Sequence, residues 1–400
     1  MFDNGMEDDP KMPKEKTFTK DKLEKKGLEL GIISFFTGAG FLDLGFEDAG
    51  FTPIMANEID ENFSRVYCYA HEKMKRPLPK FGVQTGDVCA YLEDSAKKRE
   101  LRRLIKETKK TCRFVGFIGG PPCPDFSVAG KQAGSTGKHG RLSQVYIDLI
   151  CENRPDFFVF ENVKGLWKTA RHRAFFDAIV EQVKNSGYAV AYRLINALEY
   201  GVAQDRERII LIGVKRTLCK GCFEKSSAQI NDFPWAKFIR YAMSDIRSVR
   251  WPTTDEFKED GALPRPKGIP AELTVQYWFE RNDVVHHANA SDYFVPRAGL
   301  AKMQTFPEGD DSRKCYKRIH RWRYSPTAAY GNNEVHLHPY KARRMSVAET
   351  LAIQSLPKDF VLPPDIPLSA KFKTIGNGVP YVAAKGIANT LKAFLEGIRQ

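Results

Sequence analysis

Short apolar runs alternate with amphipathic segments along the first half of the chain. Runs without a charged side chain occur at 31–36, 53–56, 114–118 and 157–160, and such runs are typical of parallel strands buried on both faces. Further strands are predicted near 190–195 and 209–214, and a short one ends at Gly86-Asp87-Val88. Helical spacing predicts helices over about 41–49, 61–72, 96–110, 143–152 and 175–183. This alternation predicts an α/β fold built on a doubly wound, mostly parallel sheet with helices on both faces.

The alternation stops near residue 215. Residues 215–340 are irregular, rich in Pro, Trp and His, and hold more Lys and Arg than Asp and Glu. Helical patterning resumes at 346–354 and at 381–396, and the last helix is expected to pack back onto the sheet. The sequence therefore predicts a flexible tail over 1–27, a first domain over 28–214, a second, smaller domain over 215–340, and a return to the first domain over 341–400.

The net charge of +13 favours a polyanionic partner. Eight scattered cysteines indicate a reducing compartment, and the lack of a long apolar stretch or signal core predicts a cytoplasmic protein that does not bind membranes. Cys219-x-x-Cys222 is half of a zinc site. Cys315 and His320 are the residues that would complete it, but there is no second tight pair, so no metal is expected.

A glycine turn follows the first predicted strand. Gly38 and Gly40 allow a ligand to approach the backbone closely, and Glu58 ends the next strand 20 residues later, where a carboxylate accepts hydrogen bonds from ribose hydroxyls. Asp87 ends the third predicted strand, at the place for an adenine amino group. The sixth position of the turn is Asp43 rather than Gly, which favours a nucleoside over a dinucleotide. The alternative to a nucleoside site is a glycine turn that happens to lie beside two surface acids.

The residues Gly119-Gly120-Pro121-Pro122 break the strand at 114–118 and place the thiol of Cys123 on a stiff turn. Glu161 ends the next strand, so both side chains are expected at one edge of a parallel sheet. A thiol nucleophile beside a carboxyl group suits attack on an electron-poor ring whose nitrogen takes up a proton. A buried structural Cys and a helix-capping Glu are the alternatives. Arg206 and Arg208 precede a later strand, where they either neutralise an anion or form surface ion pairs.

In this order, the motifs resemble those of the DNA (cytosine-5)-methyltransferases. The resemblance runs in blocks from about Ile32 to Ala388 and is interrupted by the variable region 215–340. The matching blocks are Phe36-Thr37-Gly38-Ala39-Gly40, Pro122-Cys123, Glu161-Asn162-Val163, Gln204-x-Arg206-x-Arg208, Arg343 to Gln354, and Gly376-Asn377-Gly378-Val379.

The resemblance implies a Rossmann-like, S-adenosylmethionine-dependent methyltransferase whose second domain recognises DNA. It implies a flipped cytosine, a Cys123 adduct at carbon 6, and Glu161 at ring nitrogen N3. The implied catalytic residues are Cys123, Glu161, Arg206 and Arg208. The implied S-adenosylmethionine contacts are Phe36, Gly38, Ala39, Gly40, Glu58, Asp87, Val88, Pro122, Leu142 and Asn377. The implied DNA contacts outside the basic run are Ser127, Gln204 and Arg343.

The chain departs from the common family pattern at four positions. Ser34 stands where many members have Asp, Phe41 where many have Gly, and Gly378 where Ser is common. Pro124 follows the catalytic Cys where many have Gln, so loop contacts to DNA cannot be carried over to that position. None of these changes removes a group that the chemistry needs.

A run of six Lys or Arg between 313 and 323 is interleaved with Tyr316 and Trp322 in the variable region. This pattern favours DNA contacts over a solvated charge run, and the expected DNA contacts are Lys317, Arg318, Arg321 and Arg323. Phosphate contacts are favoured for Arg318 and Arg321, and a guanine edge is the alternative. The sequence thus predicts a monomeric bacterial or phage enzyme that methylates double-stranded DNA and is paired in function, without a stable complex, with a restriction endonuclease. The alternatives are an RNA cytosine methyltransferase, a catalytically silent DNA-binding protein and a nucleotide-dependent oxidoreductase.

Overall fold

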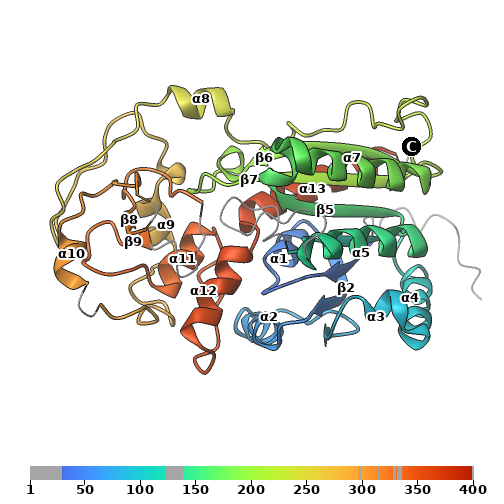
Figure 1. The fold of residues 1–400 in the computed structure, drawn as a ribbon, viewed down its shortest axis with the longest axis horizontal. Helices are drawn as coiled ribbons and strands as arrows, with labels where there is room; N and C mark the ends of the chain where they lie inside the picture. Colours follow the sequence, from blue (N-terminus) through green and yellow to red (C-terminus); the bar gives the residue numbers. More distant parts are fainter. Residues whose placement is uncertain are drawn as a thin grey trace, which may run out of the picture.

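Seven strands form one twisted sheet at the centre of the protein (Figure 1). The computed structural model describes residues 29–122, 138–296, 299–313, 315–327, 330 and 336–398. The strands are β1 (Leu30–Phe35), β2 (Phe51–Glu58), β3 (Val83–Thr85), β4 (Phe114–Gly119), β5 (Phe157–Val163), β6 (Tyr188–Asn196) and β7 (Glu207–Lys215). Their order in the sheet is β3-β2-β1-β4-β5-β7-β6.

The sheet is mostly parallel, as the sequence predicts, and β7 is the exception. It runs antiparallel to both β5 and β6, because a turn at its start returns the chain directly alongside β6 without a crossover helix. A second correction concerns β3, which ends at Thr85, so that Gly86, Asp87 and Val88 follow the strand rather than form it. Asn57 fixes this turn, since its amide nitrogen donates to the carbonyls of Gln84 and Gly86 at 3.0 and 3.1 Å.

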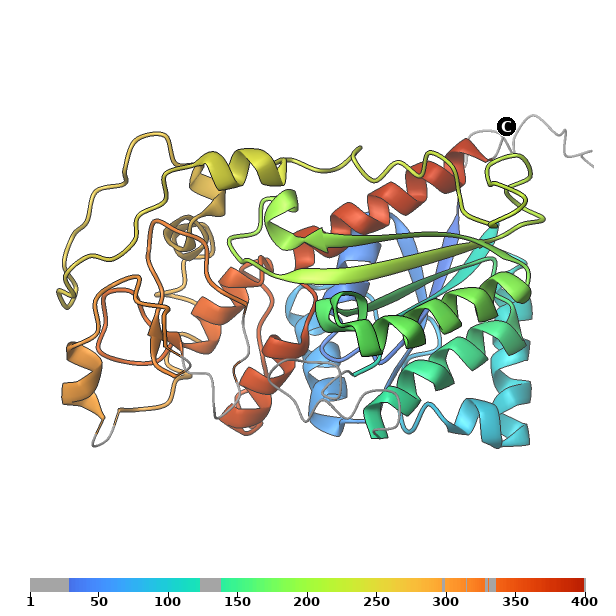
Figure 2. The same cartoon turned by 45° about the horizontal axis from the view of Figure 1, so that its top comes forward.

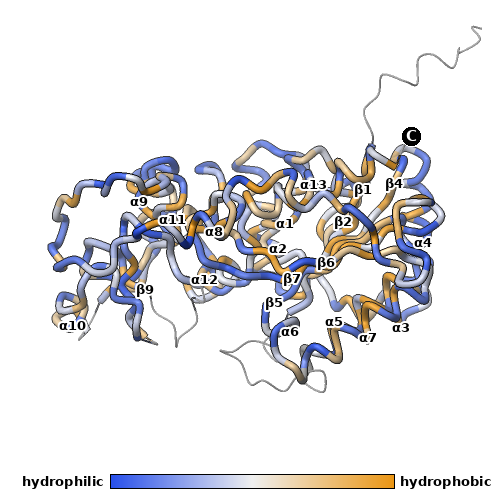
Figure 3. Tube along the Cα trace, turned by 90° about the horizontal axis from the view of Figure 1, so that it is seen from above, coloured by the Kyte–Doolittle hydropathy of each residue, from blue (hydrophilic) through white to orange (hydrophobic). Residues whose placement is uncertain are grey.

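Helices cover both faces of the sheet (Figure 2). The helices of this part are α1 (Phe41–Asp48), α2 (Glu61–Lys73), α3 (Ala90–Glu93), α4 (Ser95–Thr108), α5 (Lys138–Asn153), α6 (Lys164–Lys168), α7 (Ala170–Asn185), the 3-10 helix η3 (Ala197–Tyr200) and α13 (Tyr381–Gly397). Residues such as Ile32 and Val159 pack under α1 and α13, whereas Ile33 and Phe158 pack under α4, α5 and α7. Successive strand residues point to opposite faces, and Figure 3 shows the resulting hydrophobic strands.

A second lobe lies to one side of the sheet (Figure 1). It contains α8 (Met243–Ser248), the 3-10 helix η4 (Ala271–Leu273), α9 (Val275–Arg281), α10 (Leu300–Gln304), β8 (Lys317–Arg318) and β9 (His336–Leu337). Helix α11 (Val347–Ile353) packs against α9, and α12 (Leu368–Asn377) packs with α1 and α2. These two helices join the lobe to the sheet.

Residues just beyond 215 pack with the first lobe. Cys219, Ile230 and Phe233 belong to the same apolar cluster as β6, β7 and α13, and the rings of Phe233 and Phe394 lie 5.1 Å apart. We therefore propose that the second domain begins near residue 240 rather than at 215. Within the described ranges, no helix combines the length and the apolar character that crossing a membrane requires.

Candidate active site

The ends of β4 and β5 bring Glu161 beside the turn that leads to Cys123. The two strands are parallel neighbours, and Gly119 pairs with Phe160. A Cβ atom added to Gly120 would lie 2.6 Å from Oε2 of Glu161, so only glycine lets the carboxylate approach this backbone. The side-chain amide of Asn162 donates to the carbonyl of Pro121 at 3.4 Å. Cys123 and Ser127 themselves lie outside the described residues.

Arg208 holds the Glu161 carboxylate from the neighbouring strand. Its Nε lies 2.9 Å from Oε1 of Glu161, and both side chains are nearly buried. The antiparallel direction of β7 makes this contact possible, because it sets Arg208 opposite Val163 at the same edge of the sheet. Glu161 and Arg208, two of the predicted catalytic residues, are therefore brought together at the edge where Cys123 is expected.

Arg206 has a different environment from the one the sequence suggested. It is 2% exposed, and its Nη2 donates to the carbonyl of Gly376 at 2.9 Å. Burial, and then the adjacent Arg208, lowers the pKa of Arg206, whereas the charge of Glu161 raises it. Gln204 is also fully buried, and its backbone pairs with Ser325 of the second lobe. Arg206 thus ties the start of β7 to the end of α12. The predicted catalytic role of Arg206 and the predicted DNA contact of Gln204 stay predictions, and both side chains are buried in this structure.

The predicted nucleoside site lies at the ends of β1 and β2. Gly38 and Gly40 both have positive φ, and a Cβ atom added to Gly38 would meet nothing within 4 Å, so this backbone lines open space. The Glu58 carboxylate accepts hydrogen bonds from the backbone nitrogens of Gly38, Ile59 and Asp60 at 2.8, 3.0 and 2.9 Å. Burial raises the pKa of Glu58, and these three donors oppose the shift. The carboxylate is therefore held in place before any ligand binds.

The other predicted cofactor residues differ in how far they are exposed. Phe36 is half-buried against the ring of Tyr146 at 5.9 Å. Asp87 accepts a hydrogen bond from the backbone of Cys89 at 2.9 Å. The remaining predicted residues are buried Ala39 and Val88, half-buried Leu142 and Pro122, and Asn377, exposed at the end of α12.

Sequence reasoning missed Ile59 at the same site. This side chain is 66% exposed and follows Glu58 directly, so it is a candidate for an apolar contact with a ligand at this turn. The signal in the sequence for Ile59 is its position, because it is an apolar residue directly after Glu58, the acid that ends the strand.

Two departures from the family pattern compensate each other. A Cβ atom added to Gly378 would lie 2.1 Å from Cδ2 of Phe41, and Phe41 is buried with its ring 5.2 Å from that of Phe360. A bulky residue at 41 therefore requires glycine at 378.

Ser34, another departure from the family pattern, is paired with Asp43. Oγ of Ser34 donates to Oδ2 of Asp43 at 3.0 Å. Burial raises the pKa of Asp43 to about 6, and the nearby hydroxyls of Thr37 and Ser34 oppose the shift.

Replacing Gly378 by Ser is therefore expected to destabilise the protein by about 1–3 kcal/mol, the usual cost of overpacking a core. In the background of Phe41→Ala, the same replacement should cost less, because the ring that it strikes is gone. Urea unfolding of both single variants and the double variant measures the coupling free energy. Equal costs in the two backgrounds would contradict the steric pairing.

Two cations of the basic run in the second lobe, Arg318 and Arg321, are buried, which argues against their predicted phosphate contacts. Arg318 is fully buried, and its guanidinium donates to the carbonyls of Met303, Phe306, His338 and Lys341. Arg321 is 7% exposed, donates to both carboxylate oxygens of Glu308 at 2.7 to 3.1 Å, and also donates to Gly261.

Two further residues predicted to contact DNA, Arg323 and Arg343, have carboxylate partners. Arg323 pairs with Asp311 at 2.7 Å, and Arg343 pairs with Glu349 at 2.7 Å. Lys317 is half-buried on β8. The spacing of the charges suggested a DNA surface because the sequence alone does not reveal the carbonyls and carboxylates that surround them.

Cys219 and Cys222 do not form a metal centre with Cys315 and His320, the residues that would complete a zinc site. Cys219 is buried next to the carbonyls of Val214 and Lys215, and burial raises its pKa to about 11. His320 lies in the second lobe with its Nε2 2.8 Å from Asp255. Across the described ranges, no group of three or more His, Cys, Asp or Glu side chains is arranged to hold a metal ion.

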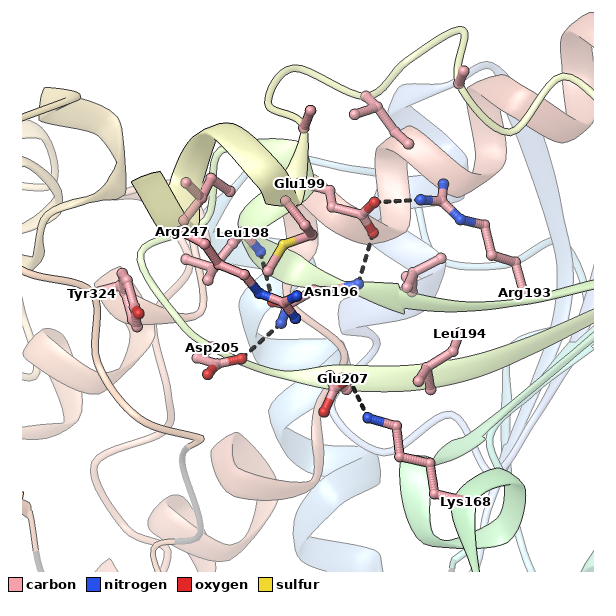
Figure 4. Close-up of a pocket in the computed structure, with 16 residues that line it drawn as sticks. Lys168, Arg193, Leu194, Asn196, Leu198, Glu199, Asp205, Glu207, Arg247 and Tyr324 are labelled. Carbon is pink, nitrogen blue, oxygen red and sulfur yellow. Dashed lines mark hydrogen bonds and ion pairs between the residues drawn. The ribbon is translucent and has the colours of Figure 1, made fainter. Parts of the chain in front are cut away.

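A cavity of about 570 Å³ lies where the two lobes meet (Figure 4). Its charged lining is paired internally: Glu199 with Arg193, Asp205 with Asn196, and Glu207 with Lys168. Arg247 and Tyr324 close it from the second lobe. None of the sequence-predicted site residues lines this cavity, so it is a seam between the lobes and not the nucleoside site.

Comparison with known proteins adds to this geometry. A family model described as C-5 cytosine-specific DNA methylase matches residues 30–393. A Type II methyltransferase of Neisseria meningitidis serogroup C, M.NmeDI, is 55% identical over 91% of this chain and 84% of its own length. The Type II methyltransferase M.FnuDI of Fusobacterium nucleatum is 29% identical over 90% and 94%. The crystal structure of the S. pombe Dnmt2 methyltransferase shares the fold with a TM-score of 0.57 at 11% identity, covering 93% of this chain and 100% of that chain.

Proposed function

Because the chain belongs to the family of C-5 cytosine-specific DNA methylases, we propose that it methylates carbon 5 of one cytosine within a short, specific sequence of double-stranded DNA, using S-adenosylmethionine. The observation that carries this proposal is the placement of Glu161 against Gly120, with Asn162 bound to Pro121. The carboxylate thereby lies beside the turn that leads into Cys123.

The residues of the nucleoside site fit S-adenosylmethionine. The turn lines open space at Gly38, Glu58 presents a fixed acceptor for ribose hydroxyls, and Ile59 presents an exposed apolar side chain for the adenine ring. The chemistry that S-adenosylmethionine supplies when bound is an electrophilic methyl group. We assign Glu58 and Ile59 to the nucleoside and the turn to close backbone contact.

The catalytic residues act on a cytosine that has left the base stack, because the faces of a stacked ring are covered. The thiolate of Cys123 adds to carbon 6 while the carboxyl group of Glu161, in its acid form, donates its proton to ring nitrogen N3, so that carbon 5 becomes nucleophilic. Arg208 keeps Glu161 oriented toward this position. After methylation, loss of the proton from carbon 5 expels Cys123 and restores the aromatic ring.

Relatives named Type II methyltransferases support a restriction-modification role. We propose that methylation protects the host DNA from a partner endonuclease of the same sequence specificity, without a stable complex, and that the protein acts as a monomer. The exchange of residues 240–340 for those of a related enzyme is expected to change which sites are methylated.

Bisulfite sequencing of DNA from cells that express the protein tests the proposed activity. We expect methylated cytosines at one position of one short sequence, and none with Cys123→Ala. Bisulfite sequencing of RNA from the same cells is the control for the alternative substrate. Methylation confined to RNA, or no methylation at all, would contradict the proposal.

Replacing Glu58 by Ala is expected to weaken S-adenosylmethionine binding by about 1–3 kcal/mol, because ribose hydroxyls lose their acceptor. Titration calorimetry measures the change in Kd. Glu61→Ala is the matched control, since this acid is exposed at the start of α2. An unchanged affinity for Glu58→Ala, or a preference for NAD, would refute the assignment.

A further inference from the structure

Helix α4 and the turn after it concentrate the positive charge of the protein. Residues 95–113 contain nine Lys or Arg and two Glu, a net charge of +7 out of +13 for the whole chain. Its apolar residues Leu101, Leu104 and Ile105 are buried against the sheet. The charge therefore lies on the surface of the helix and takes no part in the active site described above.

Four of these cations form a stripe without partners. Lys97, Lys98, Arg102 and Lys109 pair with carboxylates of α4, α5 or the start of β5. Arg99, Arg103, Lys106 and Lys110 are exposed and have no ion-pair partner within the described ranges. We call these four residues the α4 stripe.

The spacing of the α4 stripe follows one ridge of the helix. Positions 99, 103, 106 and 110 are separated by four, three and four residues, so they point the same way, opposite to the apolar side of the helix. Like charges at this spacing destabilise a helix. A helix face that is only exposed to solvent would be stabilised by alternating positive and negative side chains. A ridge of four positive charges therefore suggests a binding role.

The α4 stripe is separate from the catalytic edge. Helix α4 lies at the end of the molecule opposite α10 and the second lobe (Figures 1 and 3). Glu161, at the end of β5, pairs with Arg208 at the start of β7, and this edge faces the second lobe (Figure 2). A duplex held between the lobes would leave the α4 stripe uncovered.

We propose that the α4 stripe binds the phosphate backbone of a second segment of double-stranded DNA, without regard to its sequence. The exposed ridge is cationic and offers no large apolar side chain. A membrane-bound helix inserts an exposed apolar face, and protein interfaces are anchored by buried aromatic or apolar residues. Charge alone is enough for duplex DNA, which carries one negative charge per about 1.7 Å of its axis.

This second contact would let one enzyme molecule hold two DNA segments. Arg99 and Lys106 are seven residues apart, about 10 Å along the helix, which is long enough to follow several phosphates. The bridging of two segments rests on the proposed function, because one of the segments occupies the active site. Binding of DNA at the α4 stripe does not depend on the proposed function.

The test compares two variants with equal loss of charge. In the first, Arg99, Arg103, Lys106 and Lys110 are all replaced by Gln. In the matched control, the exposed Lys75, Lys80, Lys220 and Lys225 are replaced by Gln. Wild type and both variants are mixed with a biotinylated duplex on beads, and capture of a second, fluorescent duplex by the bound protein is measured.

We expect the stripe variant to capture at least about tenfold less of the second duplex than wild type and control, with a salt slope lower by up to about 4. The stripe variant should methylate a short duplex that contains a single recognition site with the same kcat as wild type. Equal capture by both variants would overturn the proposal, and so would stronger capture of duplex RNA or of anionic vesicles than of DNA. Loss of methylation by wild type with capture of the second duplex retained would contradict the proposed function alone.

Discussion

Replacing Glu161 by Gln is expected to lower the methylation rate by about two to four orders of magnitude, the usual contribution of a positioned general acid or base. The amide keeps the size of the side chain, so it still fits against Gly120. It cannot share a proton with N3 of cytosine as a carboxylate does, and it loses the ion pair with Arg208. Single-turnover transfer of a labelled methyl group measures the rate without product release.

Glu207→Gln is the matched control for this variant. Glu207 begins β7 and pairs with Lys164 and Lys168 at the surface, 2.9 Å from each. Its replacement should leave the rate near that of wild type. A rate for Glu161→Gln within about tenfold of wild type would remove Glu161 from the chemistry, whereas a loss of DNA binding in that variant would assign it to substrate binding instead.

Replacing Arg321 by Ala is expected to destabilise the protein by about 3–5 kcal/mol, because the Glu308 carboxylate is left buried without its partner. Glu308 is 2% exposed and receives two nitrogens of the guanidinium. The double variant Arg321→Met, Glu308→Leu should recover most of the loss, since no charge then remains buried. Guanidinium unfolding of the three proteins gives the free energies.

Arg313→Ala supplies the comparison, because this residue is 56% exposed and its pair with Asp310 spans 3.3 Å. An exposed pair is worth about 0–1 kcal/mol. If Arg321→Ala kept its stability and instead weakened DNA binding, the guanidinium would be a phosphate contact after all, and the internal role would be wrong.

The strands that carry the site could be predicted from the sequence because each is a short apolar run that ends in a polar residue. Glu58 and Glu161 both lie at such ends, and the structure places them at the edge that the parallel pattern implies. The direction of β7 could not be predicted, because its central residues are as apolar as those of the parallel strands in the same sheet. That direction brings Arg208 to Glu161.

The second lobe is where the sequence was least informative. The run at 313–323 is equally cationic whether its partners are phosphates or buried groups of the protein. Only folding shows that Arg321 meets Glu308, 13 residues earlier, and that Arg318 is enclosed by backbone carbonyls. The pairing of Phe41 with Gly378 was similarly hidden, since these positions are far apart in sequence and meet only when α1 and α12 pack.

Covalent trapping tests the central claim most directly. Duplex DNA in which 5-fluorocytosine replaces cytosine throughout is incubated with the protein and saturating S-adenosylmethionine, so that the recognition sequence need not be known. Because fluorine cannot leave carbon 5 as a proton does, we expect a complex that survives denaturation and whose DNA is attached to Cys123 in peptide mass spectrometry. No adduct with wild type, or an adduct that persists in Cys123→Ala, would contradict the account.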